Sequence, residues 1–138
     1  MEANKLMVDD WVLWKGKPVQ VASVSGVKYS FGQIDVTLAH CNDKKLLETH
    51  DIKSIQPIPL TPEILEKNGF VEINDDEKWY KMQLLEENDF VGLEKFEDYG
   101  FVFASVVFPN LINHLSINYV HELQHALKLC GIEKTIEL

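Results

Sequence analysis

The sequence predicts an α+β fold, with a small N-terminal β-barrel of the SH3-like kind followed by an antiparallel sheet that packs with a C-terminal helix. Three observations lead to this prediction. Short Val-rich runs alternate with glycines in the first part of the chain, closely spaced prolines interrupt it in "QPIPLTP", and apolar residues recur at helical spacing near the C-terminus. We therefore expect a barrel-like domain over 1–56, a connector with a short helix over 57–69, and a sheet with a helix over 70–138.

The N-terminal segment has the pattern of about five short strands. Its alternating runs are broken at Gly16, Gly26 and Gly32, where glycine permits a tight turn. The expected strands cover residues 11–14, 18–23, 27–31, 34–39 and 52–55. Regular short strands joined by tight turns are typical of a small closed or half-closed barrel.

The prolines of the connector forbid both a helix interior and a central strand. After them, Thr61 is suited to cap a short helix and Pro62 to occupy its first turn. The pair Asn68-Gly69 predicts a left-handed stop, because glycine adopts that backbone conformation without strain.

The C-terminal segment predicts three strands, a helix and a short tail. Residues 78–84, 89–96 and 101–108 are strand-like and are joined by turn-prone links, so we expect antiparallel pairing. Ser116 has the character of a helix cap and Gly131 that of a helix stop. We expect the tail, "IEKTIEL", to add a short edge strand.

Charge is distributed unevenly along the chain, whose net charge is -9. Residues 1–60 carry seven lysines and seven acids, whereas residues 61–138 carry six lysines and fifteen acids. There is no arginine, and an acidic surface repels the nucleic-acid backbone. Nucleic acid is therefore not an expected partner, while a protein partner or self-association stays open.

Several features indicate a cytoplasmic protein. The N-terminus lacks the basic start and apolar run of a secretory signal, and the most apolar stretch, "FVFASVVF", is far shorter than the ~20 residues that span a bilayer. Cys41 and Cys130 lie far apart without metal-knuckle spacing, so we expect free thiols in a reducing compartment. The acidic groups at 74–77, 86–89 and 94–98 lack the pattern of a calcium loop and are interpreted as solvated turns.

One motif suggests chemistry. The stretch "YVHELQHALKLCG" contains His-Glu-Leu-Gln-His, the HExxH pattern of zinc proteases. Histidines at i and i+4 share a side of a helix, so both reach one metal ion, and the glutamate beside the first activates metal-bound water. His121 and His125 are thus candidate zinc ligands, and Glu122 is the candidate catalytic base of a zinc-dependent hydrolase.

The rest of the chain gives this motif little support. A catalytic zinc needs a third ligand, which the common zinc proteases take from downstream. Only thirteen residues follow His125, Glu133 and Glu137 are their only carboxylates, and Gly131 does not fit the glycine position of the metzincin class. The remaining candidates are upstream, at His40, His50 and His114. A helical wheel also places His121 and His125 opposite the apolar face and near Lys128. We therefore interpret them as surface or interface side chains, with no metal and no cofactor.

The motifs "PIPLTPEILEKNGF" and "INYVHELQHAL", preceded by a "DWV...GKPVQV" segment, resemble a family of small uncharacterised proteins from gut anaerobic bacteria and their phages and mobile elements. The similarity covers nearly the whole chain, and its motifs are distinctive. The resemblance implies no activity, cofactor or binding residue. In that family the helix motif often reads YVHELQN, which speaks against His125 as a metal ligand.

Two function classes follow from these observations. The favoured one is a non-enzymatic cytoplasmic accessory or protein-interaction protein, and its place in a phage or mobile element rests on the resemblance. The alternative is the zinc-dependent hydrolase. If the N-terminal half is an SH3-like barrel, Trp14, Tyr29 and Phe31 would line an open peptide groove.

Overall fold

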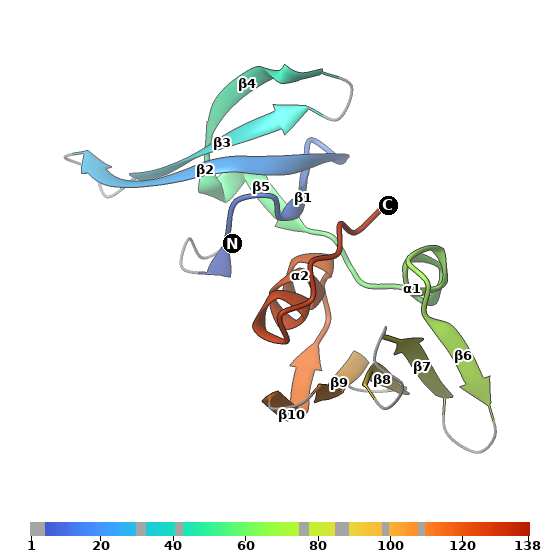
Figure 1. The fold of residues 1–138 in the computed structure, drawn as a ribbon. Helices are drawn as coiled ribbons and strands as arrows, with labels where there is room; N and C mark the ends of the chain where they lie inside the picture. Colours follow the sequence, from blue (N-terminus) through green and yellow to red (C-terminus); the bar gives the residue numbers. More distant parts are fainter. Residues whose placement is uncertain are drawn as a thin grey trace. The chain divides into compact units, whose positions relative to one another are not determined.

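A computed structural model of the protein describes residues 5–29, 33–40, 43–74, 78–84, 89–97, 100–107 and 110–138. These residues form an α+β fold with two five-stranded antiparallel sheets and a C-terminal helix (Figure 1). The chain divides into two compact units, 1–58 and 59–138, so the boundary lies within the proline-rich segment. The α+β class predicted from the sequence is confirmed.

The first unit is a five-stranded sheet in the order β4-β3-β2-β1-β5. Lys15 and Gly16 both have positive φ between β1 and β2, as a two-residue type I′ hairpin requires. The strands are β1 (Trp11–Trp14), β2 (Lys17–Tyr29), β3 (Gln33–His40), β4 (Asp43–Asp51) and β5 (Ile55–Pro57), with a 3-10 turn, η2 (Ile52–Ser54), before the last.

The strands of this unit differ from the predictions at three points. The strand expected over 52–55 is wrong for residues 52–54, which form η2, and β5 begins only at Ile55. The expected turn at Gly26 is wrong, because β2 runs through it; the glycine lies instead where the β2–β3 register shifts, between Ser25 and Tyr29. Strand β4 was not predicted, since its sequence, "DKKLLETHD", is highly charged. Charged residues are common on edge strands, which they protect from further pairing.

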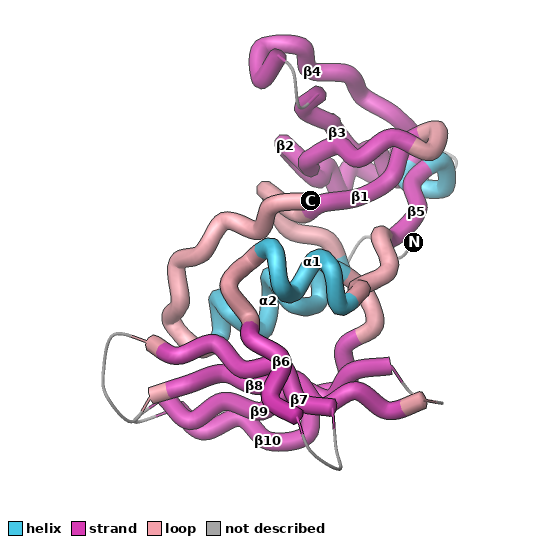
Figure 2. The backbone as a smooth tube through the Cα atoms, turned by 90° about the vertical axis from the view of Figure 1, so that its right-hand side faces the viewer, coloured by secondary structure: helices cyan, strands magenta, loops and turns pink. Residues whose placement is uncertain are grey.

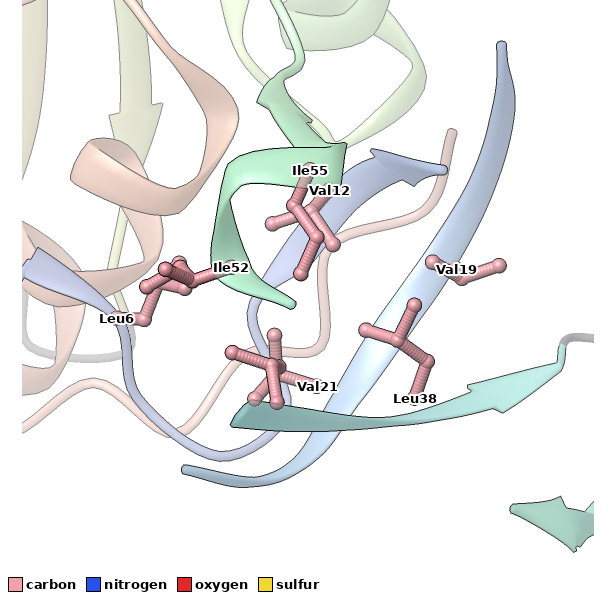
Figure 3. Packing of buried hydrophobic residues seen from close by; sticks show 8 residues of the cluster. Leu6, Val12, Val19, Val21, Leu38, Ile52 and Ile55 are labelled. Atoms are coloured by element: carbon pink, nitrogen blue, oxygen red, sulfur yellow. The ribbon is translucent and has the colours of Figure 1, made fainter. Parts of the chain in front are cut away.

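The core of the first unit gathers on one face of this sheet (Figure 3). Strands β1 and β4 are separated by β2 and β3, so a flat sheet would hold them roughly 14 Å apart. The rings of Trp14 on β1 and His50 on β4 nevertheless lie only 4.3 Å apart. The sheet is therefore strongly curled. The core residues are Leu6, Val12, Val19, Val21, Val36, Leu38, Ile52 and Ile55.

No closed barrel is found in the described part of the first unit. Strand β1 pairs with β5, but no pairing joins β5 to β4. The described residues thus form a curled, open sheet, and the SH3-like barrel stays a prediction.

The second unit packs two helices on one face of a sheet in the order β10-β9-β8-β7-β6 (Figure 2). The face under the helices is apolar and includes Tyr80, Leu93 and Phe103. The elements are α1 (Pro62–Lys67), β6 (Val71–Asn74), β7 (Lys78–Gln83), β8 (Phe90–Phe96), β9 (Gly100–Val107), β10 (Asn110–Ile117) and α2 (Val120–Leu129).

The central strands of this sheet were predicted, but its two edge strands were not. Ser116 is not a helix cap: it lies in β10, and α2 begins after Tyr119. Residues 132–138 contain no strand, so the predicted edge strand in the tail is also wrong. The actual edges, β6 and β10, are short or interrupted by polar residues, which weakens the alternation that identifies a strand.

The helix ends follow the predicted chemistry. Thr61 caps α1 by accepting a hydrogen bond from Ile64 N at 3.4 Å, and Gly69 follows the helix with φ of 88°. Phe70 N donates to Leu65 O at 3.0 Å, which completes a Schellman motif. No helix in the described ranges is long and apolar enough to cross a membrane.

The tail of the second unit is held by a buried side chain. Asn68 Nδ2 donates to the backbone oxygen of Glu137 at 2.7 Å, and Glu137 N donates to Asn68 Oδ1 at 2.8 Å. Ile136, next to Glu137, is buried. Of the two cysteines, Cys130 is a buried thiol, and Cys41 lies outside the described residues.

Candidate functional sites

The histidine motif lies in the first two turns of α2, and one of its histidines is buried. The side chain of His121 is only 3% exposed, whereas that of His125 is partly exposed. The expectation that both histidines point away from the core is therefore wrong for His121. A helical wheel shows the direction of each side chain, but it does not show which chain segments cover the helix.

The cover over His121 comes in part from Tyr119, the residue before the helix. The two rings are nearly parallel, at 11°, with centroids 5.9 Å apart. The rings of His121 and His125 are 5.7 Å apart and inclined at 76°. The Nδ1 atom of His121 makes no hydrogen bond within the described residues, although the ring has the stacking contact with Tyr119.

Glu122, the candidate catalytic base, caps the helix. Its Oε2 accepts hydrogen bonds from Asn118 N at 2.7 Å and from Tyr119 N at 3.1 Å. This is the glutamate half of a capping box, placed at the positive end of the helix dipole. The described contacts of this carboxylate thus serve the helix end.

The structure brings no third ligand to the histidine pair among the residues that it describes. No group of three or more His, Cys, Asp or Glu side chains there is arranged to hold a metal ion. His50 belongs to the first unit and lies 3.1 Å from Glu48, while the side chains of His40 and His114 are outside the described set. Of the acidic groups, residues 75–77, 86–88 and 98 lie outside the described residues. The turn expected over 94–98 is wrong for residues 94–96, which belong to strand β8.

Trp14 marks a second candidate region, on the curled sheet of the first unit. Its ring packs against the buried cluster and contacts His50, and Lys15 Nζ lies 4.5 Å from the ring centroid. Trp14 is thus partly a core residue. Tyr29 and Phe31, the other expected groove residues, lie outside the described side chains, so the groove stays a prediction.

The third candidate region was not predicted from the sequence. On the sheet face opposite the helices, Val71 is 65% exposed and Ile73 is 47% exposed, both on edge strand β6. Ile73 is directly opposite Trp79 on β7. We call Val71, Ile73 and Trp79 the apolar patch. A correct assignment of β6 would have revealed it, because "VEIN" alternates apolar and polar residues.

The Trp79 ring of the apolar patch packs against strand β8. A Cβ atom added to Gly92 on β8 would lie 3.5 Å from the Trp79 ring, so this ring rests against the strand backbone. Beside it, Lys81 Nζ lies 4.1 Å from the centroid of the Phe90 ring. The patch therefore combines a tryptophan ring packed on the sheet with the two exposed aliphatic side chains.

Carboxylates gather on the other side of β6. Glu72 points to the helix-covered face, where it is opposite Tyr80. Burial raises the pKa of Tyr80, and the charges of Glu72, Glu66 and Glu63 raise it further. We call these three glutamates the acidic group. The pKa of Glu63 itself is lowered, first by hydrogen bonds from its own backbone and from Thr61 and then by the positive charge of Lys95.

Comparison with known proteins gives no relative for this chain. No protein-family model, no curated protein and no solved structure matches it.

Proposed function

We propose that the protein is a non-enzymatic protein-interaction protein whose second unit binds a positively charged partner. The observation that carries this proposal is the apolar patch, where two aliphatic side chains stand exposed beside a tryptophan on the uncovered face of the sheet. Exposed apolar side chains that are grouped, rather than scattered, are typical of binding surfaces.

The charge of the second unit supports a basic partner. Residues 59–138 contain fifteen acids and six lysines, whereas the first unit is neutral. Glu72 lies on the same strand as the patch, and Glu63 and Glu66 on α1 act with it on the pKa of Tyr80. Complementary charge accelerates association and disfavours acidic partners, including a second copy of this chain.

The wider role follows from the resemblance and from the curled sheet. We infer that the protein acts in the cytoplasm as an accessory protein of a phage or mobile element. We also infer that the first unit is an open barrel of the SH3-like kind, a proposal supported by the approach of Trp14 to His50 across two intervening strands. No contact among the described residues favours the zinc-dependent hydrolase.

The experiment uses a synthetic octapeptide of alternating valine and lysine as the probe. Isothermal titration at low ionic strength should detect binding to the full chain, and a peptide with glutamate in place of lysine should not bind. The substitution Val71→Gln should weaken binding about five-fold, the effect of losing roughly 1 kcal/mol of apolar burial.

A matched control distinguishes binding at the apolar patch from nonspecific binding to exposed apolar side chains. Leu129 on α2 is 66% exposed, as Val71 is, but it lies outside the apolar patch. Leu129→Gln should leave the affinity unchanged. Equal losses in both variants, or equal binding of the lysine and glutamate peptides, would contradict the proposed function.

A further inference from the structure

We propose that the partner adds an extended strand to the free edge of β6 and that this strand alternates apolar and basic residues. The inference rests on the proposed function, because it specifies how the same surface is occupied. It goes beyond that function by naming the secondary structure and the sequence pattern of the bound segment.

The edge of β6 is open to a further strand. β6 is the last strand in the order β10-β9-β8-β7-β6, and it pairs with β7 alone in the described part of the sheet. Val71, Glu72 and Ile73 are all exposed. A terminal strand presents a row of backbone donors and acceptors on its outer side, where an extended peptide pairs.

The two faces at this edge differ in chemistry. Side chains alternate along a strand, so Val71 and Ile73 project to the uncovered face and Glu72 projects to the helix side. The uncovered face continues into Trp79, and on the helix side Glu72 is opposite Tyr80. An added strand would set its own alternate residues beside these two surfaces.

The alternation defines the partner. Residues beside Val71 and Ile73 gain most from being apolar, because cross-strand apolar pairs stabilise a sheet. Residues beside Glu72 gain most from being lysine or arginine, because an exposed carboxylate on the edge strand pairs with opposite charge across the strands. A helix could cover the apolar patch, but it could not pair with the backbone of β6.

The test compares the valine–lysine octapeptide with a version that is N-methylated at every second residue. Two such peptides, methylated in the two alternate registers, are titrated against the full chain. N-methylation keeps the side chains and the charge but removes the amide donors along one edge of the strand. We expect one or both methylated peptides to bind at least ten-fold more weakly than the parent peptide.

A second readout locates the contact. Amide hydrogen exchange of residues 71–73 should slow on addition of the parent peptide. The affinity of the peptide for Glu72→Lys should be about five-fold lower than its affinity for Glu133→Lys. The second variant is the control, because it changes the net charge by the same amount in the exposed tail.

Each outcome decides between the two proposals. Loss of binding on methylation, together with protection of residues 71–73, supports strand addition. Unchanged affinity of both methylated peptides overturns it but leaves the proposed function standing, because the peptide then lies on the apolar patch without backbone pairing. Failure of the parent peptide to bind overturns the proposed function and the strand addition together.

Discussion

Asn68 and Glu137 form a reciprocal pair of hydrogen bonds between positions 69 residues apart in the sequence. The amide of Asn68 imitates a peptide group, since it donates to the Glu137 oxygen and accepts from the Glu137 nitrogen. It also donates to Ile64 O at 2.8 Å, at the end of α1. One buried side chain thus closes a helix and holds the tail.

Replacing Asn68 by alanine should therefore destabilise the second unit. The change removes three hydrogen bonds and leaves buried backbone groups unpaired, so we expect a loss of about 2–4 kcal/mol in the free energy of unfolding. Urea unfolding measures the loss, and faster amide exchange at Glu137 would show that the tail is released. A loss below about 0.5 kcal/mol would contradict the role given to Asn68.

Gly100 should not tolerate alanine. It has φ of 80°, and an added Cβ would clash with Asn118 Oδ1. Gly69 is the matched control, because it has a similar φ of 88° but nothing within 4 Å of an added Cβ. We expect Gly69→Ala to cost about 1 kcal/mol from backbone strain alone and Gly100→Ala to cost more. Equal losses in thermal unfolding would show that Asn118 moves aside freely.

Glu122 should matter for stability as a helix cap. Glu122→Ala removes the acceptor for Asn118 N and Tyr119 N, with an expected cost of about 1 kcal/mol. Glu122→Gln keeps an acceptor at the same position and should cost less than half as much. Chemical denaturation of the two variants measures this difference, which would disappear if the carboxylate had no capping role.

Metal content tests the histidine pair directly. Protein purified without an affinity tag should contain much less than one zinc per chain, and His125→Ala should not change this value. A chelator should likewise leave the melting temperature unchanged, because no third ligand joins the histidine pair among the described residues. Elemental mass spectrometry measures the zinc content. Near-stoichiometric zinc in the wild type that is lost in His125→Ala would restore the hydrolase hypothesis.

Tyr80 should make the second unit sensitive to alkali. Its pKa is raised above the ordinary value of 10.0, first by burial and then by the nearby glutamates, so the folded state favours the neutral phenol. The unfolded chain releases this proton at lower pH than the folded one does. The stabilisation is therefore complete below pH 10 and declines as the pH rises through the folded pKa. Denaturation between pH 9 and 11 measures the decline, and Tyr80→Phe should make it shallower.

Local signals in the sequence were reliable at the ends of α1, whereas the same kind of signal was wrong at Gly26 and Ser116. Thr61, Pro62 and Gly69 predicted both ends of α1, because each fits a specific backbone position. The strands at the sheet edges were missed for the opposite reason. Strand β4 is charged and β6 has four residues, so neither shows the long alternation that reveals a buried strand.

The candidate sites show a similar division. The spacing of His121 and His125 was evident in the sequence, but the burial of His121 depends on Tyr119, and the cap formed by Glu122 depends on where the helix begins. The apolar patch could not be predicted without β6. Ile73 and Trp79 become neighbours only when the register of two strands is known.

The distant hydrogen bonds of the second unit also set the order in which the chain folds. Leu60 N donates to Asn118 O at 2.9 Å, and Asn68 Nδ2 donates to Glu137 O. Each hydrogen bond joins residues far apart in the sequence, so the unit must close a large loop before either bond can stabilise it. Loop closure of this kind slows folding. Most strand pairs in both units join consecutive strands, β1–β2, β2–β3 and β3–β4 in the first unit and β6 to β10 in the second, whereas β1 also pairs with the distant β5. The consecutive strand pairs of both units should therefore form first, and the second unit should complete its fold only when residues 136 and 137 dock.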